Sequence, residues 1–149
     1  MNNHEVSMEG RRILEAELLR RGASSVIWQR TRKVLLLATS ADASRTVDIR
    51  VKVKRRGNWH TTIDEGRAID GALVPQESGS FWTLLDLGGP PRYWIVPERW
   101  IRNHIYETHR EYIAEHGGHR PVNDSSRHHS INEMGVAEWQ DRWEVLGLF

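Results

Sequence analysis

Six basic residues lie within the twelve positions 45–56 of this chain. In the middle of this segment, charged residues alternate with aliphatic residues. In a β-strand, successive side chains point to opposite faces, so this alternation predicts one charged face and one apolar face. The charged face would hold Asp48, Arg50, Lys52 and Lys54, and the apolar face Val47, Ile49, Val51 and Val53. A solvated strand surface shows the same pattern, and an acidic partner protein would also suit it.

Arginine and lysine at this density favour contact with the phosphates of nucleic acid. A tryptophan just after the strand is a candidate surface for a stacked base. The candidate nucleic-acid-binding residues are Arg45, Arg50, Lys52, Lys54, Arg55, Arg56 and Trp59.

One carboxylate lies among apolar residues on an expected helix. Residues 8–21 have helical spacing, with Ile13, Leu14 and Leu18 on one side. Glu17 is three residues from Leu14 and four from Ile13, so it shares the inward-facing side. This position favours either a functional carboxylate or an ion pair with an arginine at the end of the helix.

The composition is that of one globular domain. The chain has 149 residues, of which 38% are hydrophobic and 28% charged, and it has no cysteine. Disulfides, thiolate metal sites and cysteine nucleophiles are therefore excluded. No apolar run approaches the ~20 residues that a membrane-spanning helix needs. We expect a single domain over residues 1–149, with residues 1–8 flexible, in the cytoplasm and without a membrane partner.

The net charge of +1 conceals a strong segregation of charge. Residues 1–60 hold 13 Lys and Arg against 6 Asp and Glu, whereas residues 61–149 hold 8 against 14. Such asymmetry favours a basic surface for an anionic partner.

Strand and helix patterns along the rest of the chain indicate an α/β fold. Strands are predicted near residues 26–28, 34–37, 47–54, 81–87 and 93–96, and helices near residues 8–21, 97–116 and 139–143. Gly88 to Pro91 has the composition of a hairpin turn. Residues 57–80 and 119–130 are predicted to be loops. We therefore expect a central mixed sheet of about five strands flanked by helices.

Three segments, in this order, resemble the PD-(D/E)XK nuclease-like superfamily, in particular its small bacterial members. They are Glu15–Gly22, similar to the first helix, Val34–Ser40, similar to the strand that carries an aspartate, and Ile49–Lys52, similar to the strand that carries Glu-X-Lys or Gln-X-Lys. Together with later segments, the resemblance covers roughly residues 9–148. It implies a restriction-endonuclease-like fold and Mg²⁺-dependent hydrolysis of phosphodiesters, in which the metal neutralises phosphoryl charge and generates hydroxide.

Two central positions depart from the family pattern. The aspartate position falls on Leu35 or a neighbour, and Arg50 occupies the position of Glu or Gln. Glu17 and Lys52 remain as matches, and Asp48 would share a strand face with Arg50 as a migrated ligand. The resemblance thus implies Glu17, Asp48 and Lys52 as catalytic candidates, with Glu17 and Asp48 on the metal.

Loss of both central ligands favours binding over cleavage. We expect a nuclease-like protein with a decayed metal site and no cofactor, which binds nucleic acid (DNA before RNA) or a protein through its basic strand. A second copy of the chain, in a homodimer, counts among the protein partners. One alternative is an active endonuclease that uses Mg²⁺, and another is an interaction module of the antitoxin or immunity type.

Overall fold

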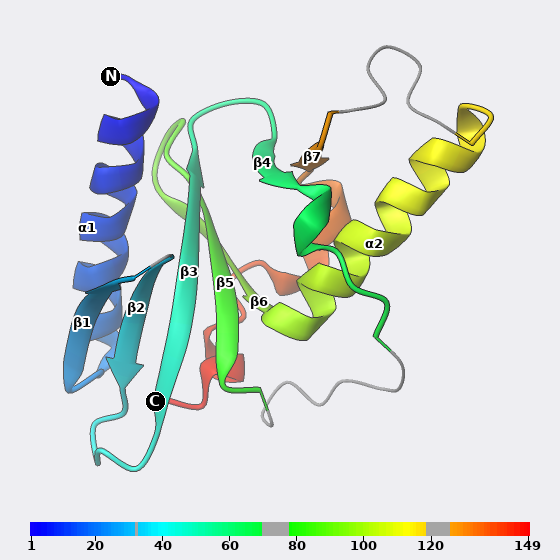
Figure 1. Ribbon diagram of the computed structural model, residues 1–149. Helices are drawn as coiled ribbons and strands as arrows, with labels where there is room; N and C mark the ends of the chain where they lie inside the picture. Colours follow the sequence, from blue (N-terminus) through cyan, green and yellow to red (C-terminus); the bar gives the residue numbers. More distant parts are fainter. Residues whose placement is uncertain (32, 70–77, 119–125) are drawn as a thin grey trace.

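The computed structural model describes residues 1–31, 33–69, 78–118 and 126–149, and its centre is a five-stranded mixed sheet (Figure 1). The strands are β1 (Ser25–Arg30), β2 (Val34–Thr39), β3 (Thr46–Lys54), β5 (Ser80–Asp86) and β6 (Arg92–Pro97), in the order β1-β2-β3-β5-β6. Neighbours are antiparallel except β3 and β5, which are parallel. The expected α/β domain, with a central mixed sheet of five strands and flanking helices, is confirmed.

Helix α1 (Asn3–Arg21) covers the apolar face of β3. Its buried residues Val6, Gly10, Leu14 and Leu18 are spaced four apart and form one stripe toward the sheet. The helix therefore begins five residues before the predicted start. Asn2 caps it, since its side-chain oxygen accepts a 2.9 Å hydrogen bond from the amide of Glu5.

A second layer covers the opposite face of the sheet (Figure 1). It consists of α2 (Glu98–Glu115), the 3₁₀ turn η1 (Ile63–Glu65) and a two-stranded sheet of β4 (Trp59–Thr62) and β7 (His128–Ile131). The prediction of loops over residues 57–80 and 119–130 is wrong for β4 and β7. Each strand is short, and their pairing joins segments about 70 residues apart, for example Trp59 with Ile131. Residues 119–125 and 70–77 of these predicted loops lie outside the described residues.

The chain ends in two 3₁₀ turns, η3 (Met134–Trp139) and η4 (Trp143–Leu146), in place of the predicted terminal helix. Their side chains nevertheless face the core, where Trp139, Trp143 and Leu146 are buried. Within the described ranges, no helix is both long and apolar enough to cross a membrane.

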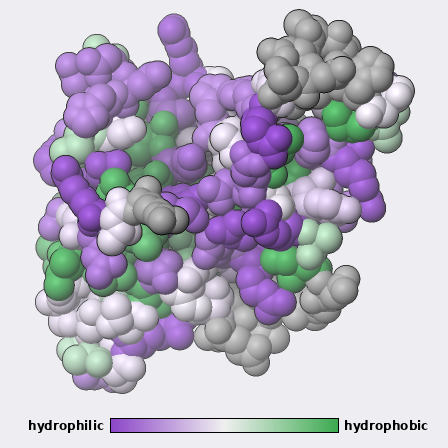
Figure 2. Space-filling model, in the orientation of Figure 1, coloured by the Kyte–Doolittle hydropathy of each residue, from purple (hydrophilic) through white to green (hydrophobic). Residues whose placement is uncertain are grey.

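The second layer leaves part of the sheet uncovered. On the face shown in Figure 2, hydrophobic residues show over β1 and β2, whereas hydrophilic residues gather over η1. Ile27 of β1 is 57% exposed there, and Leu35 and Leu37 of β2 are half-buried. The side chains of β2 that point away from α1 are therefore only partly covered.

Strand β3 is longer than its pairing with β2. The β2–β3 register ends at Leu36 and Ile49, whereas β5 follows β3 as far as Lys54 and Asp86. In the described part of the chain, residues 50–54 of β3 thus have a paired strand on one edge and none on the other. An unpaired edge presents backbone N–H and C=O groups to whatever approaches it.

The close approach of α1 to β3 gives a first testable prediction. A Cβ at Gly10 would lie 2.4 Å from Cγ2 and 2.8 Å from Cγ1 of Val53. Because the β-branched valine has little rotamer freedom, we expect Gly10→Ala to lower the free energy of unfolding by about 1–3 kcal/mol, despite the higher helix propensity of alanine. Chemical denaturation measures this.

The double variant G10A/V53A is the matched control. With the valine methyl groups removed, the alanine at position 10 should stabilise the protein relative to V53A alone. A neutral or stabilising effect of Gly10→Ala in the wild-type background would show that this contact does not set the distance between helix and sheet.

Candidate functional site

The three catalytic candidates do not meet in the structure. Glu17 lies on α1 and accepts hydrogen bonds from Arg20 and Arg21, at 2.5 and 2.9 Å. The hydrogen bond from Arg20 is the main cause that lowers the pKa of Glu17. Asp48 and Lys52 lie on the face of β3 that points away from α1, so the sheet separates them from Glu17.

Asp48 itself accepts a hydrogen bond from the hydroxyl of Ser80 on the neighbouring strand, at 2.9 Å. Leu35, where the family pattern places an aspartate, is half-buried on β2 opposite Gln29. In the residues that the structure describes, no group of three or more His, Asp or Glu side chains is arranged to hold a metal ion. The arrangement of Glu17, Asp48 and Lys52 therefore offers no shared centre for Mg²⁺.

Arg50 takes part in an internal ion-pair network. Its guanidinium lies 2.8 Å from Glu65 of η1 and 4.8 Å from the ring centre of Trp82. Glu65 also pairs with Arg102 of α2, at 3.2 Å, and the Arg50 side chain is 12% exposed. Burial alone would raise the pKa of Glu65, but the hydrogen bond and charge of Arg50, with the charges of Lys33 and Arg102, outweigh it and lower that pKa. Arg50 thus links β3 to the second layer.

Lys54 is also neutralised inside the protein. Its ammonium group donates to the carbonyl of Gly57 at 2.6 Å and to Glu133 at 2.8 Å, and it lies 3.6 Å from Asp86. Only 7% of its side chain is exposed. Hydrogen bonds from Arg92 and then Lys54 lower the pKa of Glu133 to about 2. This cluster joins β3, β5, β6 and the segment before η3.

Two further candidates have structural positions. Arg45 donates to the carbonyl of Leu146 at 2.7 Å and to that of Ser78, so it ties the β2–β3 turn to the C-terminal segment. Trp59 is 1% exposed, and its indole N–H donates to the carbonyl of Leu85 at 2.8 Å. Its ring packs edge-on against Trp94, at 4.9 Å. The prediction that Trp59 offers a surface for a stacked base is therefore wrong.

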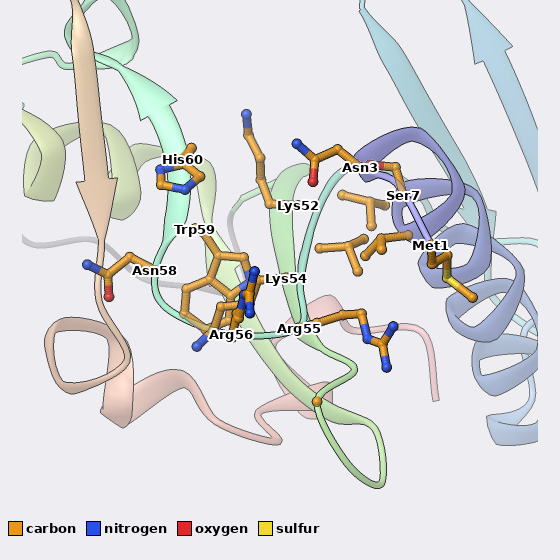
Figure 3. Close-up of a pocket in the computed structure, with 14 residues that line it drawn as sticks. Met1, Asn3, Ser7, Lys52, Lys54, Arg55, Arg56, Asn58, Trp59 and His60 are labelled. Carbon is orange, nitrogen blue, oxygen red and sulfur yellow. The ribbon is translucent and has the colours of Figure 1, made fainter.

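The remaining candidates, Lys52, Arg55 and Arg56, line one groove of about 860 Å³ (Figure 3). Asn3 and Ser7 of α1 lie on one side of the groove, and β4 lies on the other. Among the described residues, the lining consists of Met1, Asn3, Val6, Ser7, Val51, Lys52, Val53, Lys54, Arg55, Arg56, Asn58, Trp59, His60 and Gly88. Because the consecutive residues 51–54 all contribute, the unpaired edge of β3 faces the groove.

The chemistry of this groove is cationic. None of the fourteen lining residues is Asp or Glu. Among the described residues, no ion pair is formed by Lys52, Arg55 or Arg56, and both arginines are exposed. Burial, together with the charge of Arg50, lowers the pKa of Lys52, although the charge of Glu65 opposes this. An anion in the groove would stabilise the charged form of this lysine.

Sequence reasoning missed the groove's other wall. The sequence pattern predicts a flexible end at Asn3 and Ser7 and a loop at Asn58 and His60. A signal for the first pair exists: Val6 and Gly10 continue, at intervals of four, the stripe that Leu14 and Leu18 begin. No local signal reveals β4, because four residues that alternate in burial carry little pattern.

Comparison of the chain with protein-family models, with curated proteins and with solved structures finds no match.

The Lys54 cluster predicts how stability depends on pH. A carboxyl whose pKa is lower in the folded than in the unfolded protein stabilises the fold above its unfolded pKa, and loses this effect as the pH falls toward the folded value. For Glu133 the window runs from about 4.5 down to about 2. We expect Glu133→Gln to lower the free energy of unfolding at pH 7, with the difference from wild type disappearing toward pH 2.

Denaturant unfolding at several pH values tests this, and Glu138→Gln, at an exposed glutamate of η3, serves as the control. That variant should follow the wild-type curve throughout. A difference for Glu133→Gln that stays constant between pH 7 and pH 2 would contradict the assigned role of the charge.

Proposed function

We propose that this protein binds nucleic acid through the groove at the unpaired edge of β3, and that it does not cleave it. The observation that carries this proposal is the lining of the groove. Its cations Lys52, Arg55 and Arg56 form no ion pair within the described chain, and none of its described lining residues is a carboxylate. Phosphate oxygens are suitable partners for these cations.

The groove also offers donors suited to a phosphate backbone. The guanidinium groups of Arg55 and Arg56 can each form paired hydrogen bonds with a phosphate, and Lys52 of β3 adds a point charge. Asn3, Ser7 and Asn58 add neutral donors at the rim. Trp59 of the lining is buried, and the exposed ring of the lining is the imidazole of His60, so most of this surface is suited to the backbone.

The choice of nucleic acid, and DNA before RNA, is supported by the resemblance to the PD-(D/E)XK superfamily. The absence of catalysis is supported by geometry, since Glu17 is bonded to two arginines on the far side of the sheet and Arg50 is paired with Glu65. The protein would then be a nuclease-like domain whose metal site has decayed and whose binding surface lies at the strand edge.

The free edge of β3 favours one second candidate function. An extended acidic peptide could add to residues 50–54 as a further strand, with its carboxylates against Lys52 and Arg55. This would make the chain an interaction module of the antitoxin or immunity type.

Binding through the groove predicts the behaviour of a triple variant. We expect K52A/R55A/R56A to weaken binding to a short DNA duplex by at least about tenfold at low salt, and to reduce the slope of log K against log salt by about 3, roughly one for each lost phosphate contact. Fluorescence anisotropy at several salt concentrations measures both quantities.

The control is R20A/R99A/R110A, which removes the same charge from exposed arginines that do not line the groove. It should bind nearly as well as wild type. Equal losses in the two triple variants would show that only the net charge matters, and would overturn the groove as the site. Affinity for an acidic peptide, with none for DNA, would favour the interaction module.

Incubation with plasmid and single-stranded DNA plus Mg²⁺ or Mn²⁺ tests the absence of catalysis. We expect no cleavage. Cleavage that is abolished by both Glu17→Ala and Lys52→Ala would establish the active endonuclease instead.

A further inference from the structure

A second hollow, of about 220 Å³, lies between the middle of α1 and the end of the β1–β2 hairpin. It is lined by Met8, Arg11, Arg12, Glu15, Trp28, Arg30 and Val34. Three of these side chains are apolar and three are arginines, so the hollow combines an apolar floor with a net positive rim. None of its residues is among the candidate site residues found from the sequence.

The half-buried ring of Trp28 is held in a fixed orientation. Its indole N–H donates to the carboxylate of Glu15 at 3.2 Å, and the guanidinium of Arg11 lies 5.8 Å from the ring centre. The carboxylate of Glu15 is therefore engaged in a hydrogen bond within the hollow, whereas Arg30, which also lines it, is exposed. A rigid aromatic surface beside arginines is the arrangement on which unpaired bases stack in proteins that bind single-stranded nucleic acid.

The hollow lies next to the cationic groove along the same helix. Ser7 lines the groove, and the next residue, Met8, lines the hollow. The mean positions of the α1 residues that line the two sites differ by about six residues, which at 1.5 Å per residue is about 9 Å along the helix axis. Val34 marks the point where β2 begins, close to where β2 and β3 separate. One strand of nucleic acid can therefore reach both.

We propose that the hollow at Trp28 binds an unpaired base of a nucleic acid strand whose phosphates occupy the groove. This inference rests on the proposed function and narrows its ligand to nucleic acid with a single-stranded segment. Each site contacts a different part of the strand: the groove contacts the phosphate backbone, and Trp28 contacts a base.

The test compares a single-stranded DNA oligonucleotide with an abasic oligonucleotide of the same length, which keeps the phosphates and lacks the bases. We expect wild-type protein to bind the base-containing strand more tightly by roughly 5- to 100-fold, the effect of one base–aromatic stack. Trp28→Leu should reduce this affinity to that for the abasic strand, whereas Trp28→Phe, which keeps a ring, should retain most of the preference.

Affinity for the abasic strand serves as the internal control, because it should be unchanged in Trp28→Leu if that variant folds. Ile27→Ala, at an exposed neighbour on the opposite face of β1, should leave both affinities unchanged. Equal wild-type affinity for the two strands would overturn the base site while the groove proposal stands. Failure to bind either strand, together with failure to bind the duplex, would overturn the proposed function itself.

Discussion

Two cations under the second layer, Arg50 and Lys54, determine how this protein is built. Each is almost fully buried on the face of β3 that turns away from α1, and an unpaired charge in such a place costs several kcal/mol. Glu65 and Glu133 come from distant parts of the chain to pair with them. These pairs bring η1 and the segment before η3 onto the sheet, next to the paired strands β4 and β7 that precede them in the chain. The ion pairs and the second layer therefore depend on one another.

The internal pairing of these cations limits which basic side chains an anion could contact. A basic strand seen in the sequence would offer all its cations to phosphate, but the folded protein uses Arg45, Arg50 and Lys54 internally. The cations of this segment that have no internal ion-pair partner in the described chain are Lys52, near the end of β3, and Arg55 and Arg56, in the turn after it. The groove exists there because β3 continues beyond the point where β2 stops pairing with it.

The relation to nucleases stays a prediction, yet the structure shows how the corresponding positions are used. Arg50, which the resemblance aligns with a Glu or Gln of the family, pairs with Glu65 of η1, so this position holds an internal ion pair. Glu17 lies behind the sheet with its own arginines. The surfaces proposed for binding lie beside these residues, at the strand edge and at the ring of Trp28.

The sequence by itself determined the elements whose signals are local and repeated. The alternation from Val47 to Lys54 predicted β3 and its two faces correctly, the i, i+4 stripe through Leu14 and Leu18 predicted α1, and the turn at Gly88 to Pro91 predicted the β5–β6 hairpin. The fold class followed from their order. Periodicity predicts these elements because the regular geometry of a helix or strand determines which face each side chain points to.

Only the tertiary structure decided which charges are free and which aromatic rings are accessible. Lys54 meets Glu133 across 79 residues, and Trp59 is buried because β4 pairs with a strand about 70 residues away. Lys52, between two neutralised cations in the same alternation, has no such partner among the described residues. Such long-range pairings leave no local pattern in the sequence. Because of them, the accessible positive charge lies in the groove at the edge of β3 and not along the whole strand.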